Sequence, residues 1–208
     1  MRRGARWLGD KFAAALGLAV LLALPACSVN VKKGDNGDDK KVDIETPMGG
    51  IHVRQDASAR DTGLPVYPGA HEKEKSGPNR EKNANVNISA GSFGLKVVAI
   101  EYVSDDPPEK VAAYYKDHLK SYGTILECHT TERHGAAGDV GVHLPRGPDG
   151  KDSNQLSCEH DSGPTLELKV GTKQNQHIVS ISPLDKGKGT DFALVFVQIH
   201  GVGDKDTI

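Results

Sequence analysis

Two short segments of the chain gather cysteines and histidines, the side chains that bind metals or act as nucleophiles. ECHTTERH contains Cys128, His129 and His134, and SCEH contains Cys158 and His160. Thiolate and imidazole groups ligate Zn²⁺, and a thiolate beside a histidine can act as a nucleophile. The third possibility is an ordinary disulfide with histidines nearby. The choice depends on the compartment in which the chain folds.

The N-terminus predicts export from the cytoplasm. Arg2, Arg3 and Arg6 precede an unbroken apolar run from Phe12 to Leu24. This run has the length of the apolar region of a signal peptide and is short for a membrane-spanning helix. The formal net charge of −2 gives no indication of a nucleic-acid partner.

The sequence LPAC at residues 24–27 resembles the bacterial lipobox, in which Leu and two mostly small residues precede an invariant Cys. The resemblance implies that residues 1–26 are a lipoprotein signal peptide and that Cys27 is acylated. Acyl chains would then hold the protein at the membrane without a transmembrane helix. Ser28 stands where Asp would signal retention in the inner membrane, so the outer membrane is favoured in a cell that has one.

The predicted compartment favours a disulfide between the two remaining cysteines. Thiols outside the cytoplasm tend to oxidise, and Cys128 and Cys158 form an even pair once Cys27 is acylated. Closing their 30-residue separation would contribute about 3 to 4 kcal/mol. Adjacent Cys128 and His129 on one strand would point to opposite faces, and the spacing matches no established zinc motif. We expect no metal and no cofactor, although a weak histidine site stays an alternative.

The chain after the signal peptide divides into three predicted parts. Residues 27–63 are a polar tether or a small β-meander, because VNVKK, KKVDIET and IHVR each keep a period of two. Residues 64–201 form one domain, and residues 202–208 form a C-terminal tail.

Several strands and one helix are predicted in the domain, which gives an α+β fold: an antiparallel sheet with one principal helix packed on it. LKVVAIEYV and FALVFVQI have the apolar, β-branched composition of central strands. The other strands are expected at residues 84–89, 124–131, 155–160, 165–170 and 176–183.

The predicted helix begins after SDDPPE, with an Asp cap and prolines in the first turn, and ends at Gly123. Its expected apolar face consists of Val111, Tyr114, Tyr115, His118, Leu119 and Tyr122. We interpret the aromatic residues of this face as core rather than as a platform for a ligand.

The segment LPVYPGA, followed by a strand and then by SDDPPEKVAAYYKDHL, resembles a set of uncharacterised bacterial envelope proteins. The stretch DIETPMGGIHV is also typical of that set. The resemblance implies the domain boundaries given above and implies no activity.

Two functions are compatible with these features. The first is a non-enzymatic envelope lipoprotein that binds a partner or small ligand through a sheet face or through the loop at residues 132–154. The alternative is an envelope hydrolase whose catalytic residues the sequence does not identify. Residues 91–94, GSFG, lack the spacing of a G-x-S-x-G nucleophile elbow.

Overall fold

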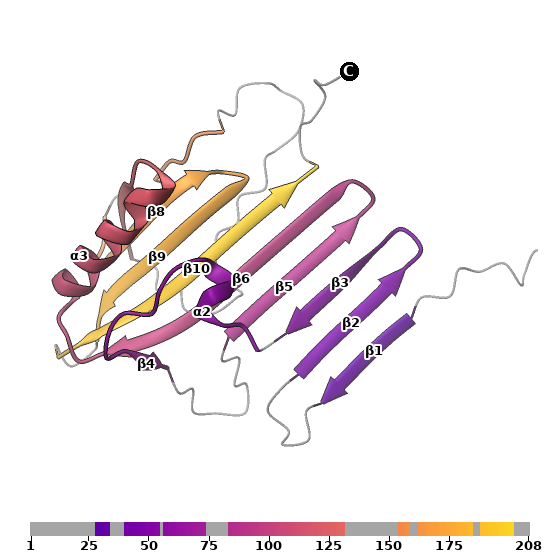
Figure 1. The fold of residues 1–208 in the computed structure, drawn as a ribbon, viewed down its shortest axis with the longest axis horizontal. Helices are drawn as coiled ribbons and strands as arrows, with labels where there is room; N and C mark the ends of the chain where they lie inside the picture. Colours follow the sequence, from indigo (N-terminus) through magenta and orange to yellow (C-terminus); the bar gives the residue numbers. More distant parts are fainter. Residues whose placement is uncertain are drawn as a thin grey trace, which may run out of the picture.

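A computed structural model describes residues 28–33, 40–54, 56–73, 83–131, 154–158, 162–184 and 188–201. Within these residues the chain forms one antiparallel sheet of ten strands, in the order β1-β2-β3-β5-β6-β10-β9-β8-β7 with β4 paired to β6 (Figure 1). The strands are β1 (Ser28–Lys33), β2 (Lys40–Thr46), β3 (Gly49–Arg54), β4 (His71–Glu72), β5 (Asn83–Ala90), β6 (Phe93–Ser104), β7 (Leu126–Thr130), β8 (Thr165–Thr172), β9 (Asn175–Pro183) and β10 (Thr190–His200). The predicted α+β class with an antiparallel sheet is confirmed, and the sheet dominates the fold.

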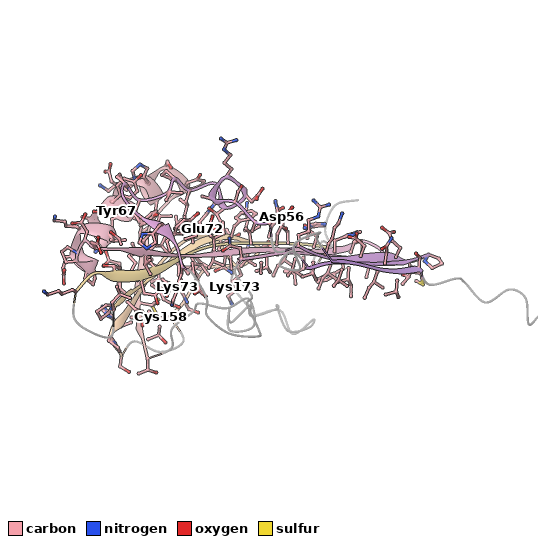
Figure 2. The ribbon with its side chains drawn as sticks, turned by 90° about the horizontal axis from the view of Figure 1, so that it is seen from below. Asp56, Tyr67, Glu72, Lys73, Cys158 and Lys173 are labelled. Atoms are coloured by element: carbon pink, nitrogen blue, oxygen red, sulfur yellow. A yellow bond between two sulfur atoms is a disulfide. The ribbon has the colours of Figure 1, made fainter. Side chains whose placement is uncertain are left out.

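The helical elements lie on one side of the sheet. They are α2 (Ala59–Thr62), α3 (Pro108–Leu119) and the 3₁₀ turn η1 (Lys120–Tyr122). Figure 2 shows them above the sheet, which is seen edge-on, with Tyr67 on the same side. We call this the helix side, and the other face the opposite side. No helix in the described part of the chain is long and apolar enough to cross a bilayer.

The first three strands form the predicted β-meander, and they continue the sheet rather than standing apart from it. Alternating apolar and polar residues in β1, β2 and β3 favour half-buried strands. β3 pairs with β5 from Gly49 opposite Ala90 to Arg54 opposite Asn85. We call β1–β3 the wing, and β6–β10 with α3 the body. The proposed division of the chain at residue 63 stays a prediction.

The main core fills the space between α3 and the body strands. The two predicted central strands, β6 and β10, pair along their whole length, from Thr190 opposite Ser104 to His200 opposite Gly94. One face of β6 is buried at Val98 and Ile100, and the other is buried at Val97 but half-buried at Leu95 and Ala99. The fully buried side chains of this core include Val98, Ile100, Val111, Tyr115, Leu119, Leu168 and Leu194.

The predicted helix is confirmed as α3, but its capping differs from expectation. The N-cap is Pro107 rather than an Asp, and it makes no side-chain cap bond. Asp106 instead accepts hydrogen bonds from Tyr67 Oη at 2.8 Å and from Lys110 Nζ at 2.9 Å. The last turn tightens to a 3₁₀ helix before Gly123, and Tyr122 on that turn is 42% exposed rather than core.

Two further expectations need correction. The strand predicted at residues 155–160 is irregular over residues 155–158. Its chain is held by the disulfide of Cys158 and, just before it, by the Lys173 N–H, which donates to the Asn154 carbonyl at 3.1 Å. The four-residue helix α2 was missed, since one turn is too short to show a period. The signal peptide with Cys27, residues 132–153 of the predicted binding loop, residues 159–161 and the C-terminal tail lie outside the described residues.

Candidate functional site

Two rows of aliphatic residues cross the opposite side of the sheet. The pairing register aligns them from strand to strand, and alternate residues of a strand share one face. The first row, from β1 to β10, contains Val29, Ile44, Ile51, Ile88, Leu95 and Ile199. The second row, from β2 to β10, contains Val42, Val53, Val86, Val97 and Val197. We call these two sets the aliphatic rows.

The aliphatic rows are buried at β10 and open on the wing. Val197 is 0% exposed and Ile199 is 4% exposed, whereas Ile51 is 37% exposed and Val29 is 63% exposed. Isolated apolar residues on a surface are ordinary, but a contiguous apolar patch marks an interaction site. The wing end of the aliphatic rows is therefore the candidate functional site.

The helix side of the wing is polar and ion-paired. His52 Nδ1 lies 2.9 Å from Asp43 Oδ1, and Lys41 Nζ lies 3.5 Å from Asp43 Oδ2. The hydrogen bond from His52, with the Lys41 charge, lowers the pKa of Asp43. His52 Nε2 is 3.7 Å from Glu45 Oε1. The second ring nitrogen therefore faces a carboxylate, whereas a serine-type catalytic site requires a hydroxyl there.

The two edges of the described sheet differ in whether other residues cover them. Along the described sheet, β1 pairs with β2 only, so its outer edge is unpaired. At the other edge, the Ser162 N–H donates a hydrogen bond to the His129 carbonyl of β7 at 3.0 Å. Cys158, just before it in the chain, is bonded to Cys128 of β7 (Figure 2). An unpaired edge is a template for a further strand, whereas a covered edge is not.

The structure contains the disulfide that was predicted from compartment and parity. The Cα atoms of Cys128 and Cys158 lie 5.5 Å apart, within the range a disulfide accepts. Cys128 pairs with Glu167 and His129 with Leu166 in the β7–β8 register, so the two neighbours lie on opposite faces as expected. His134 and His160 lie outside the described residues.

No metal centre is formed in the part of the chain that the structure describes. Among those residues, no group of three or more His, Cys, Asp or Glu side chains is placed to hold an ion. The joined cysteines are also unable to act as thiolate ligands.

A charged cluster also lies on the opposite side, at the end of β6 and β10 remote from Ile199. Lys73 donates a hydrogen bond to Asp191, and its Nζ lies 3.6 Å from Glu101 Oε2. Burial by itself lowers the pKa of Lys73, but the hydrogen bond and charge of Asp191, together with Glu101, raise it overall. The lysine therefore stays a cation and pairs with both carboxylates. This ion pairing favours a structural role.

The segments LPVYPGA and SDDPPEKVAAYYKDHL contact each other. The Tyr67 N–H of YPGA donates to Tyr115 Oη of α3 at 3.1 Å, and Tyr115 Oη donates to the Pro65 carbonyl at 3.2 Å. Tyr115 is fully buried, and this burial raises its pKa. Both segments therefore serve to dock α3 on the sheet, and the interpretation of the aromatic residues as core holds for Tyr115.

The sequence contained the signal for the aliphatic rows but not their extent. Period-two alternation was visible in the pairs Val29/Val31, Val42/Ile44 and Ile51/Val53. Which strands are neighbours, and hence that these residues join Ile88 and Leu95, depends on pairing between distant segments.

Comparisons with protein-family models, with curated proteins and with solved structures find no match to this chain. The function is therefore argued from the geometry of the wing.

Proposed function

We propose that this protein is a non-enzymatic lipoprotein of the bacterial cell envelope that binds an envelope partner through its wing. Acyl chains on Cys27 hold it at the membrane, with the outer membrane favoured by Ser28. The lipobox and the preceding apolar run support the anchor. The likeness to uncharacterised envelope proteins agrees with this location and adds no activity.

One observation carries the binding role: among the described residues, one edge of the sheet is covered, whereas the other edge strand, β1, pairs with β2 alone. The segment at Cys158 and Ser162 lies along β7, whereas β1 has a single described neighbour, β2. Natural proteins usually block edge strands, because their free N–H and C=O groups recruit further strands. The open edge of β1 suits an extended segment of a partner, which would add to the sheet through main-chain hydrogen bonds.

Cross-linking from the two edges of the sheet tests this role. A photoreactive phenylalanine analogue replaces either Asn30 on β1 or His129 on β7, both of which are exposed. In intact cells we expect a discrete cross-linked product from position 30 and none from position 129. Equal products from both positions, or no product from position 30, would contradict binding at the β1 edge.

The anchor is tested separately by mass. The purified wild-type protein should carry acyl chains at Cys27, and Cys27→Ser should release the protein from membranes. An unacylated, membrane-free wild type would refute the anchor.

A further inference from the structure

One end of the sheet collects the segments nearest to the predicted anchor. Ser28, which directly follows Cys27 in the chain, pairs with Glu45 at the end of β2. The turn from β2 to β3 carries Met48, whose side chain is 82% exposed. The Gly91 N–H in the turn from β5 to β6 donates to the Met48 carbonyl at 2.8 Å. These turns lie side by side along the end of the sheet at which β1 begins (Figure 1).

The first aliphatic row lies at this same end. Val29 is two residues after Cys27, and Ile44 and Ile51 follow it across the wing. Consecutive Cα atoms are about 3.8 Å apart, so no linker separates acyl chains on Cys27 from the apolar face of β1. The most exposed apolar residues of the wing, Met48 and Val29, therefore lie at the end of the sheet where β1 begins.

The size of this face decides between a second copy of the chain and a lipid surface. With strands about 4.8 Å apart and residues of one face about 7 Å apart, the aliphatic rows cover on the order of 300 Å². A stable interface between two proteins buries about 800 Å² on each partner. The rows alone fall well short of that value. An apolar face that supplements acyl chains needs no such area, because the anchor already holds it at the surface.

The charged residues of the wing lie on the face that does not carry the aliphatic rows. The helix side of the wing carries Lys41, Asp43, Glu45 and His52 in ion pairs, whereas the opposite side of the wing carries the aliphatic rows. A sheet that is apolar on one face and charged on the other suits a boundary between lipid and water, like an interfacial amphipathic helix.

We propose that the aliphatic rows of the wing rest on the lipid bilayer beside the acyl chains of Cys27, with Met48 inserted at the level of the headgroups. The inference rests on the acylation in the proposed function. It deepens that function by giving the wing a fixed orientation: the rows face lipid, the polar side faces water, and the β1 edge stays open to a partner.

Tryptophan fluorescence gives a direct test, because the single native tryptophan, Trp7, lies in the predicted signal peptide. Met48→Trp therefore introduces the only tryptophan of the mature acylated protein. The matched control is Val66→Trp, because Val66 is exposed, at 38%, on a segment that packs on the helix side. Each protein is reconstituted into vesicles with or without lipids brominated on their acyl chains.

We expect brominated lipids to reduce the emission of Trp at position 48 by about twofold, since an interfacial apolar face lies about 5 to 10 Å into the boundary. Emission from position 66 should not change. Adding Ile51→Ser to the Met48→Trp protein should weaken the quenching, whereas adding Val66→Ser should not. Ile51 and Val66 are equally exposed, at 37% and 38%. A difference between the two substitutions therefore reflects where the residue lies, not the loss of an exposed apolar side chain as such.

Equal quenching by brominated lipids at positions 48 and 66, in proteins whose mass shows acylation, would overturn the inference and leave the proposed anchor intact. Absence of acylation would instead refute the anchor and the inference with it. A dimer that forms in solution and shields position 48 without quenching would identify a second copy as the occupant, which also overturns the inference.

Discussion

The body and the wing are parts of one antiparallel sheet, yet they are stabilised differently. In the body, α3 covers the helix side, and Leu119 and Ile100 are fully buried. In the wing, the described residues put no helix over either face, and Ile51 remains 37% exposed. Alternation decides which face of a strand is apolar, whereas a second packed layer decides whether burial of that face stabilises the fold.

The largest expected effect lies in the body. Leu119→Ala removes a fully buried side chain from the interface of α3 with the sheet, so the free energy of unfolding should fall by about 2 to 5 kcal/mol. Urea denaturation of the mature protein measures the change. A loss below about 0.5 kcal/mol would contradict the packing of this helix face.

The disulfide at the β7 edge comes next. Replacing Cys128 and Cys158 by Ser should lower the free energy of unfolding by about 3 kcal/mol, because the unfolded chain regains the freedom of an open loop. If Cys27 is acylated as proposed, thiol titration of the unfolded wild type should find no reactive thiol before reduction and two after it. Two free thiols before reduction would contradict the bond.

The matched substitution in the wing should hardly change the stability of the protein. Ile51→Ala removes side-chain atoms that are already partly in water, so the free energy of unfolding should change by less than about 1 kcal/mol. The same urea experiment measures it. A loss of unfolding free energy equal to that of Leu119→Ala would contradict the difference between wing and body. It would show that another layer buries the aliphatic rows.

The smallest effect concerns pH and again separates the two regions. His177 of β9 donates from Nδ1 to the Thr62 carbonyl at 2.8 Å and packs on Tyr122. Burial lowers the pKa of His177 below its usual 6.5, although the hydrogen bond to Thr62 opposes this. A depressed histidine pKa means that the unfolded chain takes up the proton first. The stabilisation is full above about pH 6.5 and falls as the pH drops towards the folded pKa.

Unfolding midpoints at about pH 7.5 and about pH 5.5 should therefore differ less in His177→Gln than in the wild type. Equal pH dependence in wild type and His177→Gln would contradict the role of burial at this histidine.

Local patterns predicted most elements, and nonlocal pairing explains the rest. Most strands followed from periodicity or apolar composition, although β4 was missed, and α3 followed from its prolines, its apolar face and Gly123. The disulfide followed from the predicted compartment and an even cysteine count. The helix α2 left one local trace that was not used: Ser58 and Asp61 form a capping box, with the Ser58 N–H donating to Asp61 Oδ2 at 2.9 Å. The Asp cap of α3 was wrong because Asp106 is engaged by Tyr67, a residue distant in sequence.

The candidate site was the least predictable part. Each wing strand showed its own apolar face, but the register from Val29 across to Ile199 joins segments that lie far apart in the chain. No local pattern states which strand follows which in a sheet. The same limit applies to the charged cluster, where Lys73 meets Asp191.

The position of β10 has a consequence for how the molecule folds. It is the last described strand in the sequence, yet it lies between β6 and β9. The two meanders that flank it, β1–β6 and β7–β9, can each form from sequence neighbours. In the described sheet they are joined by β10, which we call the central seam. Closing the seam brings residues 93–104 against residues 190–200, so the entropy of a long loop must be overcome before those contacts form. During synthesis, β6 and β9 each present an open edge until Thr190 and the residues after it become available, and open strand edges favour aggregation in this interval.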